Sequence, residues 1–480
     1  MEAYWRLPVR LQEAALSLYA RRLDKLYYGS LYEEWKEWLS GWKDWPESYI
    51  KDWQNARLKH VIATAGRKVP YYVEKWKGRD WESVGSEAAL AVLPTFEKQS
   101  IRQNEVAFIA DDKNPTSLWL KKTSGTTGTS LRIYWPPSML PKWWAITEVM
   151  IRHAGRAARE MPRAMMGGRP IISGNTSRPP YWRFNRRWNQ LYLSSYHVSK
   201  KTASHYISAL KKHGSQWLTG YGSAIAALAE SASDAGSERH PLKTVIVSGD
   251  TLLPGMRRSI ETFFQCKCFD SYGQAEGVSI AMECDSGRMH VLPVVGITEI
   301  LRKDGSPCKP GEVGEIVATG LLNDAMPLIR YRTGDYASWA VEQDCPCGSP
   351  NRIIANLEGR VDDYLLTTDG RKIGRLSTAL KRSPSIHSAQ LVQDRPGRAY
   401  FLVQPGRGYK PSHATAVCDD ILERIGRFDL QVVEVPEIPR TPRGKAALVV
   451  RLDDCASMKD VYEAVIQNSA NRYGLPEYSG

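Results

Sequence analysis

The segment from residue 123 to residue 129 has the composition of a ligand-binding loop, because it contains only glycine and small hydroxyl residues. It follows a short strand-like run, and its glycines allow backbone amides to approach an anion closely. Its hydroxyls can donate hydrogen bonds to phosphate oxygens. It lacks the Gly-Lys-Ser/Thr ending of a Walker loop, and an ordinary surface loop is the alternative. The residues are Thr123, Ser124, Gly125, Thr126, Thr127, Gly128 and Thr129.

A second segment, Asp270 to Glu276, places a tyrosine and a carboxylate on either side of a glycine. Tyr272, at the end of a predicted strand, can stack on a purine. Glu276, four residues later, can hold Mg²⁺ beside phosphates. The alternative is a strand–turn–helix junction, where a helix dipole favours glutamate in the first turn.

Three further segments carry single charged residues after turns. Asp335 follows Gly334 and is suited to binding ribose hydroxyls, although aspartate is common in plain turns. Residues 357–364 lie at the proposed domain boundary, and taken alone they could be a polar linker with no special role. Lys445 follows a glycine in a proline-rich loop and, taken alone, is an ordinary surface lysine.

Cysteine and histidine occur at spacings that suggest a metal site. Three cysteines and one histidine are a common structural zinc set. The ligands we predict are Cys284, His290, Cys345 and Cys347. The alternative is a tight turn with reduced thiols, since Cys-x-Cys is closer than the usual finger spacing. Cys266 and Cys268 are rival ligands, but they lie in a strand pattern.

Strands and helices alternate between about Leu90 and Glu358. Residues 244–248 and 267–272 are predicted strands that end in glycine turns, and residues 254–264 between them form a predicted helix. This order indicates an α/β fold with a largely parallel sheet. Ligands bind such sheets at the carboxyl ends of the strands, where both turns lie.

The chain divides into a large part, 1–359, and a small α+β part, 360–480. Residues 1–79 have the apolar spacing of amphipathic helices, as in Leu11, Ala15, Leu18 and Tyr19. We expect this helical start to pack onto a neighbouring domain rather than to line a pocket. Turn signals between Gly296 and Ala340 predict hairpins and a small β-barrel, and a helix is predicted near residues 413–425.

The composition excludes several classes of protein. The 480 residues carry a formal charge of +13, which could face nucleic acid, a membrane surface or anionic substrates. The chain has no basic and aromatic motif typical of nucleic-acid binding. No apolar run reaches the roughly 20 residues that span a bilayer, and no basic, then apolar, leader is present. We therefore predict a cytoplasmic protein that binds no nucleic acid and has no membrane span.

Taken together and in this order, the five charged or hydroxyl-rich segments resemble those of the adenylate-forming superfamily. This superfamily includes acyl-CoA synthetases, adenylation domains of peptide synthetases and luciferases. The chain is most similar to the phenylacetate–CoA ligase-like branch, and the similarity covers nearly its whole length. The marks of this branch are Val69-Pro-Tyr-Tyr72, Val247-Ser-Gly-Asp-Thr-Leu252, Cys345-Pro-Cys-Gly348 and Gly359-Arg-Val-Asp-Asp363. Some members of the branch carry zinc at similar positions.

The resemblance implies that the chain binds ATP and Mg²⁺. Residues 123–129 would grip the β- and γ-phosphates, Gly249 and Asp250 would border the adenine, and Tyr272 would lie against it. Glu276 would help bind Mg²⁺. The implied nucleotide-binding positions are Thr123–Thr129, Gly249, Asp250, Ser271, Tyr272, Gly273, Glu276, Asp335, Arg360 and Lys445.

The resemblance also implies roles for the second part of the chain. Asp335 would hold the ribose with Arg360 close by, and Asp362 would be the hinge of a mobile C-terminal domain. Lys445 would reach the substrate carboxylate and the α-phosphate, with Glu276 and Thr126 as the other implied catalytic residues. One departure is Ala275, where the superfamily usually has threonine.

The implied reaction is activation of a carboxylic acid as acyl-AMP with release of pyrophosphate, followed by transfer to CoA. An amine or a carrier-protein thiol is the alternative acceptor, and a homodimer is left open. We expect the acid to lie near residues 217–223, 247–249 and 271–274. A catalytically silent nucleotide-binding protein is disfavoured by the intact set of motif residues.

Overall fold

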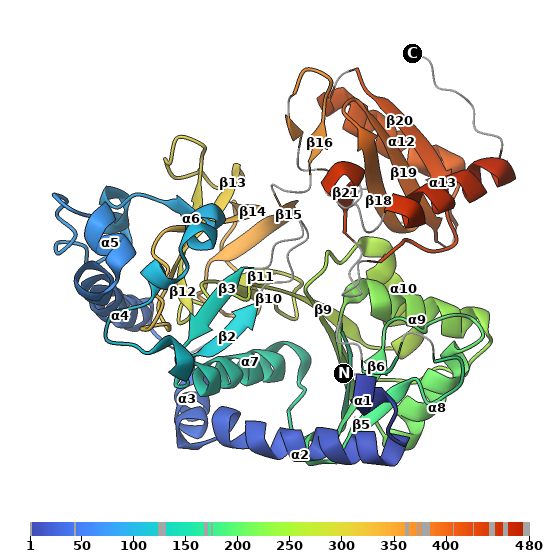
Figure 1. Ribbon diagram of the computed structural model, residues 1–480, viewed down its shortest axis with the longest axis horizontal. Helices are drawn as coiled ribbons and strands as arrows, with labels where there is room; N and C mark the ends of the chain where they lie inside the picture. Colours follow the sequence, from blue (N-terminus) through green and yellow to red (C-terminus); the bar gives the residue numbers. More distant parts are fainter. Residues whose placement is uncertain are drawn as a thin grey trace.

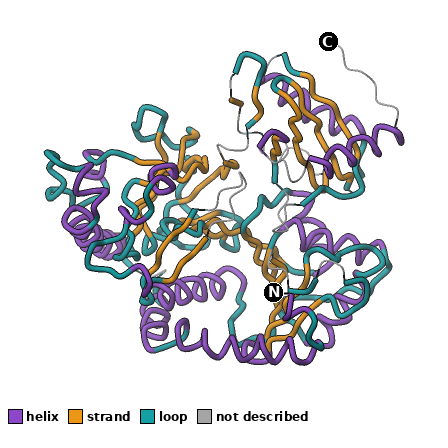
Figure 2. The backbone as a smooth tube through the Cα atoms, viewed as in Figure 1, coloured by secondary structure: helices purple, strands orange, loops and turns teal. Residues whose placement is uncertain are grey.

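The computed structural model describes residues 2–42, 45–122, 131–167, 171–173, 176–360, 364–370, 372–373, 376, 385–406, 408–425, 427–440, 447–454 and 459–473. Figure 1 shows the chain coloured from its N-terminus to its C-terminus, with the large part below and to the left and the last strands and helices at the upper right. Figure 2 shows strands through the middle of the large part and helices on its outer sides.

Helices make up the beginning of the chain, as predicted for residues 1–79. They are α1 (Glu2–Trp5), α2 (Val9–Tyr27), α3 (Ser30–Ser40), α4 (Glu47–Lys68) and α5 (Pro70–Lys75). Leu58, Val61 and Ala65 of α4 are buried and share a core with Tyr72 of α5. The core extends to the short helices η1 (Ala88–Val92), α6 (Lys98–Gln103) and η2 (Val106–Phe108). The next short helix, η3 (Pro115–Ser117), contributes no buried residue.

A mixed sheet of thirteen described strands forms the centre of the molecule. Its parallel half contains β4 (Arg163–Gly167), β6 (Gln190–Ser194), β7 (Trp217–Gly220), β8 (Thr244–Ser248) and β9 (Lys267–Gly273), and β5 (Trp182–Asn185) is antiparallel at the edge. The helices that join or flank these strands are α7 (Met139–Gly155), η4 (Arg186–Trp188), α8 (Ala203–His213), α9 (Gly222–Asp234) and α10 (Pro254–Phe264). The predicted strand–helix–strand unit at 244–272 is thus confirmed.

Alternating side chains place two different cores on the two faces of this parallel half. Ile246 and Phe269 pack on the face that carries α7, whereas Val245 and Cys268 pack on the face that carries α8, α9 and α10. Successive residues of a strand point to opposite faces, and a parallel sheet needs both faces covered. The nearly continuous apolar run at 244–247 therefore specifies a strand buried on both sides.

The antiparallel half of the same sheet contains the predicted hairpins. It comprises β10 (Ile280–Glu283), β11 (Met289–Val291), β12 (Gly296–Leu301), β13 (Val313–Gly320), β14 (Tyr331–Trp339) and β15 (Ile353–Arg360), and the short β1 (Phe96–Glu97) pairs with β14. The separate small barrel predicted here is not found among the described strands. β15 pairs with β14 on one edge and with β11 on the other, so the hairpins continue the large sheet as an open ladder.

Two smaller sheets complete the strands. β2 (Trp119–Lys122) and β3 (Arg132–Trp135) form an antiparallel pair in the large part. Near the C-terminus, β20, β19, β18 and β21 form a four-stranded sheet in that order. The strands of this sheet are β18 (Ile386–Arg395), β19 (Arg398–Pro405), β20 (Asp429–Glu434) and β21 (Val449–Arg451). The helices of the same region are α12 (Pro411–Ile425), η5 (Leu452–Asp454) and α13 (Lys459–Tyr473). A small pair, β16 (Leu365–Leu366) and β17 (Lys372–Ile373), precedes them.

The helix predicted near residues 413–425 corresponds to α12. Apolar residues of β18 and β19 join the same core as α9 and α10, so the C-terminal sheet packs against the helical face of the large sheet. Within the part of the chain that the structure describes, no helix combines the length and apolarity needed to cross a bilayer.

Candidate functional site

The carboxyl ends of β7, β8 and β9 bring several predicted ligand-binding residues together. Gly220 of β7 lies beside Val247 of β8, and Ser248 of β8 lies beside Ser271 of β9. The chain leaves β8 through Gly249, whose φ of 84° favours glycine. Gly249, Asp250, Ser271, Tyr272 and Gly273 therefore gather at one edge of the sheet, where parallel sheets bind ligands.

Asp250 is held at the start of α9. Its carboxylate accepts hydrogen bonds from the amide of Gly222 at 2.8 Å and from the amide and hydroxyl of Ser223 at 3.2 and 2.6 Å. Burial raises the pKa of Asp250, and the hydrogen bonds from Ser223 and Gly222 act in the opposite direction. The carboxylate thus satisfies amides at a helix N-terminus, which fixes the turn after β8 against the turn after β7.

Tyr272 and Asp335 form a buried pair that sequence spacing does not reveal. The Tyr272 hydroxyl donates to Asp335 Oδ2 at 2.8 Å, and Gln274 donates to the same hydroxyl. The Thr333 hydroxyl accepts from the Asp335 amide at 3.1 Å. Burial, and then the Asp335 charge, raises the pKa of Tyr272 well above its usual value, so the phenol stays a donor. Tyr272 therefore orients Asp335.

Glu276 is also held by a tyrosine. Its Oε1 accepts from the Tyr331 hydroxyl at 2.8 Å, and both side chains are buried. Glu276 lies in a turn between β9 and β10, so the alternative of a helix beginning there is wrong. The turn requires Gly277, because its φ is 69° and a Cβ would lie 2.6 Å from Trp135. Tyr331, four residues before Asp335, is not among the residues that the sequence predicts for the site.

The structure describes only some of the remaining predicted site residues. Thr123–Thr129, Asp362 and Lys445 lie outside the described residues. The described neighbours of the first segment, Lys122 and Arg132, are partners in the β2–β3 pair. Arg360 lies opposite Asp335 in the β14–β15 ladder, so the backbones of these two residues are neighbours, as their predicted closeness requires.

Lys121, next to the predicted phosphate loop, is enclosed by aromatic rings and was not selected from the sequence. Its Nζ lies 3.3 Å from the ring centre of Trp135 and 5.4 Å from that of Trp143. Burial lowers the pKa of Lys121 to about 7. The sequence pattern predicts the loop after the strand. It does not predict the surroundings of Lys121, because Trp135 belongs to β3 and Trp143 belongs to α7.

One predicted segment of the acid pocket is partly wrong. Trp217 begins β7, and its indole donates to the Ala158 carbonyl at 3.1 Å in the core. It therefore lies at the amino end of the strand, one strand length away from the edge where Tyr221 and Gly222 begin α9. A strand separates its two ends by about 3.3 Å per residue, so the predicted range 217–223 cannot belong wholly to one pocket.

The four predicted metal ligands lie together. The ligand atoms of Cys284, His290, Cys345 and Cys347 are all within 4.8 Å of one another. Cys284 Sγ is 3.6 Å from Cys345 Sγ, and Cys347 Sγ is 3.4 Å from His290 Nε2. His290 Nδ1 lies 3.0 Å from the Asn351 carbonyl, which identifies Nδ1 as the donor and leaves Nε2 to face the thiols. The rivals Cys266 and Cys268 do not belong to this cluster.

Two contacts join the C-terminal sheet region to α9. Arg440 donates to the Ser223 hydroxyl at 2.8 Å and to the Ser223 carbonyl at 3.0 Å. About two turns further along α9, Glu230 contacts His387 of β18. Arg440 immediately precedes residues 441–446, so the first contact anchors the chain beside the segment that contains Lys445.

Comparison with known proteins supports the fold and its family. No protein-family model matches the chain. It is 25% identical over 457 residues to protein CapK of Staphylococcus aureus, covering 92% of this chain and 97% of CapK. It is 24% identical over 427 residues to phenylacetate-coenzyme A ligase of Aromatoleum evansii, covering 83% of this chain and 93% of that ligase.

Solved structures share the architecture at lower identity. A 2-hydroxyisobutyryl-CoA ligase in its postadenylation state, bound to an acyl-AMP, superposes with a TM-score of 0.63 at 17% identity, covering 88% of this chain and 93% of that ligase. The fold, the relatives matched over most of their length and the motif residues gathered at one sheet edge all point to the same family. By its fold and its relatives, the chain is similar to the adenylate-forming superfamily and, within it, to the phenylacetate–CoA ligase-like branch.

Proposed function

We propose that this protein activates a carboxylic acid with ATP as an acyl-adenylate, releases pyrophosphate, and transfers the acyl group to CoA. The observation that carries the proposal is the pair of buried carboxylates, Asp335 and Glu276, each oriented by a tyrosine hydroxyl. Both lie beside the carboxyl ends of the parallel strands. Relatives with CoA-ligase names support CoA as the acceptor.

In the first step a carboxylate oxygen attacks the α-phosphorus of ATP, and the bond from that phosphorus to the bridging oxygen of pyrophosphate breaks. Such a transfer depends on alignment and charge neutralisation more than on covalent help. Asp335 would hold the ribose hydroxyls, residues 123–129 would hold the β- and γ-phosphates, and Lys445 would bring positive charge to the reacting oxygens.

Glu276 is a suitable group for Mg²⁺, which would reduce the charge on the phosphates. Its carboxylate is a hard oxygen ligand, and the Tyr331 hydroxyl holds Oε1 at 2.8 Å. Tyr331 is fully buried, so the carboxylate has a fixed orientation at the edge of the sheet.

In the second step the CoA sulfur attacks the acyl carbonyl carbon, the thiol proton passes to solvent, and AMP leaves. The C-terminal part, residues 360–480, would reorient about Asp362 between the steps, so that Lys445 serves the first step and the acceptor reaches the adenylate in the second. An amine or a carrier-protein thiol would react at the same carbon, and product analysis separates these acceptors.

Pyrophosphate release across a panel of carboxylic acids tests the proposal. We expect acid-dependent release from the wild-type protein, and a loss of at least a hundredfold in Lys445→Ala, because one preorganised positive charge contributes about 3 kcal/mol to such a step. Lys410→Ala, at an exposed lysine of the same part of the chain, is the matched control. No acid-dependent release, or equal rates in the two variants, would overturn the proposal.

We also propose that Cys284, His290, Cys345 and Cys347 bind a structural zinc ion. In tetrahedral zinc sites, Zn–S bonds near 2.3 Å place sulfur atoms about 3.8 Å apart. The 3.6 Å separation of Cys284 and Cys345 and the donor bond from His290 to Asn351 both suit such a site. The ion would tie the β10–β11 hairpin to residues 345–351.

Metal analysis of the purified protein tests the zinc proposal. We expect about one zinc per chain in the wild-type protein and in Cys266→Ser, and a strong reduction in Cys347→Ser. Cys266 is a fair control because it is a cysteine outside the cluster. The same zinc content in Cys347→Ser and wild type, or none in the wild type, would rule out this ligand set.

A further inference from the structure

Helix α2 turns an apolar stripe toward the outside of the molecule. Leu11, Leu18 and Tyr19 are 54%, 68% and 52% exposed, and Ala14 and Ala15 between them are exposed as well. Positions 11, 14, 15 and 18 have the spacing that places side chains on one helical face. Leu7, just before the helix, extends the stripe and is 40% exposed.

The inward face of the same helix buries Ala20 and Leu23, but it meets β5 and η4 through polar side chains. Gln12 is only 3% exposed and accepts from Arg183 at 2.6 Å. Glu13 accepts from the amide of Phe184 at 2.9 Å, and Asp24 accepts from the indole of Trp188 at 2.6 Å. Helices on globular proteins bury their apolar stripe, whereas α2 docks on β5 and η4 through hydrogen bonds and leaves its apolar stripe uncovered.

Positive charge flanks the stripe at both ends. The exposed basic residues are Arg6 and Arg10 at one end, and Arg21, Arg22 and Lys25 at the other. No ion pair joins any of them to an acidic side chain that the structure describes. The acidic side chains of α2 itself, Glu13 and Asp24, make the inward contacts. The outward face therefore combines apolar residues with uncompensated cations.

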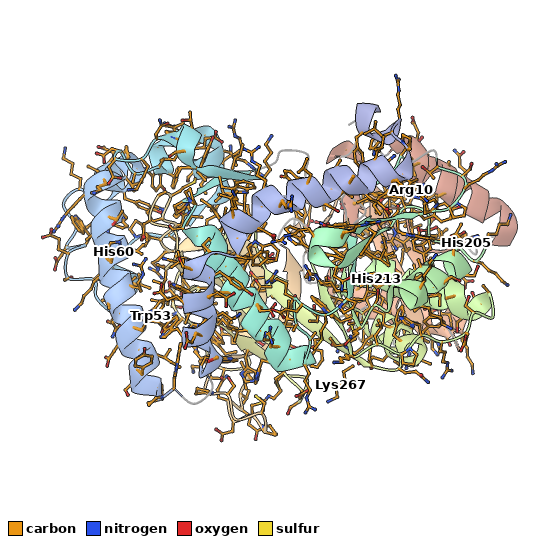
Figure 3. All side chains as sticks on the ribbon, turned by 90° about the horizontal axis from the view of Figure 1, so that it is seen from below. Arg10, Trp53, His60, His205, His213 and Lys267 are labelled. Carbon is orange, nitrogen blue, oxygen red and sulfur yellow. The ribbon has the colours of Figure 1, made fainter. Side chains whose placement is uncertain are left out.

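The face is open to a large flat partner. In Figure 1, α2 runs along the lower edge of the molecule, away from the C-terminal sheet. In Figure 3 the molecule is seen from below, and α2, with Arg10 labelled near one end, crosses this side of the molecule. A surface that meets this side would reach the whole helix at once.

We propose that this face of α2 binds an anionic lipid bilayer. The helix would lie in the plane of the membrane surface, with Leu11 and Leu18 at the boundary between headgroups and acyl chains. Arg21, Arg22 and the other cations would contact anionic headgroups. Charge complementarity selects this partner, because the face has cations at both ends and the whole chain carries a formal charge of +13.

Flotation of the full-length protein with lipid vesicles tests the proposal. We expect the wild-type protein to bind vesicles of mixed phosphatidylglycerol and phosphatidylcholine, and to bind pure phosphatidylcholine vesicles weakly. Raising the salt concentration should weaken binding, since the ionic contacts are exposed. Each of two double variants, Leu11→Ser/Leu18→Ser and Arg21→Gln/Arg22→Gln, should lower the partition coefficient by on the order of tenfold.

Val92→Ser/Val106→Ser is the matched control, because these valines are 50% and 58% exposed and lie outside α2. We expect it to bind like the wild type, and circular dichroism melting should show all variants folded. The proposal is overturned if the wild-type protein does not float with anionic vesicles, or if the α2 variants float equally well. It is also overturned if light scattering shows a dimer that Leu11→Ser/Leu18→Ser dissociates, since the stripe would then join two copies of the chain.

Discussion

Two hydrogen bonds from tyrosine to carboxylate define the candidate site at the level of single residues. Tyr272 holds Asp335 and Tyr331 holds Glu276, each at 2.8 Å. Both phenols are buried, and burial raises the pKa of Tyr272, so its hydroxyl stays a donor and presents Asp335 in one orientation. Preorganised polar groups of this kind give binding sites their geometry without reorganisation when a ligand arrives.

Tyr272→Phe tests this orientation. The substitution keeps the ring in its apolar surroundings and removes the hydrogen bond to a charged group, a loss of about 1.5 kcal/mol. We predict that KM for ATP rises on the order of tenfold while kcat changes less. Steady-state pyrophosphate release measures both, with exposed Tyr19→Phe as the control. An unchanged KM would show that the hydroxyl does not position the ribose-binding carboxylate.

Lys121 supplies a prediction about stability and pH. Its pKa is about 7 in the folded protein, against about 10.4 in an unfolded chain. Between these values the unfolded chain binds more protons, so the Lys121 contribution to stability rises with pH and is lost as pH falls through 7. The face of Trp135 favours the charged form, but burial is the larger effect.

Lys121→Met should remove this pH dependence. Denaturant unfolding between pH 7 and pH 10 measures it, and we expect the wild-type free energy of unfolding to rise relative to that of the variant across the range. The adjacent Lys122→Met is the control, because Lys122 is exposed on the same strand. Parallel pH profiles for wild type and Lys121→Met would contradict the prediction.

At the scale of elements, the site depends on how α9 is clamped. Asp250 holds the amino end of α9 from the turn after β8, and Arg440 contacts Ser223 at that same end. Removal of the guanidinium leaves the Ser223 hydroxyl and carbonyl without this donor, which costs more than the bond itself contributes. The chain just after Arg440 contains Lys445, so the contact is a suitable anchor for it.

Arg440→Ala should therefore lower kcat for pyrophosphate release more than it changes KM for ATP, and Arg440→Lys should restore part of the rate. We expect a fall of at least tenfold, the equivalent of about 1.4 kcal/mol. Arg427→Ala, at an exposed arginine of the same sheet region, serves as the control. Equal losses in Arg440→Ala and Arg440→Lys would point to a general structural role instead of positioning.

At the scale of the whole molecule, the C-terminal sheet packs against α9 and α10. In the proposed two-step reaction, this packing is one of the two orientations that the C-terminal part would adopt. Glu230 of α9 and His387 of β18 touch across this boundary. A disulfide formed between cysteines at the two positions would hold the C-terminal part where it is. An enzyme that must reorient between two steps would then complete only one of them.

Glu230→Cys/His387→Cys should lose acyl-CoA formation when oxidised, keep one of the two half-reactions, and recover when reduced. Pyrophosphate release and transfer from a supplied acyl-adenylate report the half-reactions separately, and mass spectrometry confirms the disulfide. Each single-cysteine variant should be insensitive to oxidation. Full turnover by the cross-linked protein would show that no reorientation at this boundary is needed.

Local patterns in the sequence were sufficient to predict several helices and strands of this protein. Apolar runs that end in glycine predict β8 and β9, and the proline and apolar spacing between them predict α10. Such features depend on neighbours in the chain, so propensity and periodicity specify them. The four predicted metal ligands lie within 4.8 Å of one another, so their proximity is confirmed, whereas zinc binding and the roles of Glu276 and Asp335 stay predictions. Residues 123–129, Asp362 and Lys445 stay predictions.

Contacts between distant segments were decided only by the tertiary structure. The Tyr272–Asp335 and Tyr331–Glu276 hydrogen bonds join residues 63 and 55 positions apart, so no local spacing encodes them. The open ladder replaces the predicted barrel because β15 pairs with both β14 and β11. Likewise the periodicity of α2 predicts an apolar stripe but not its direction. The stripe faces outward because the polar side of the helix finds its hydrogen-bond partners on β5 and η4, which are about 170 residues away.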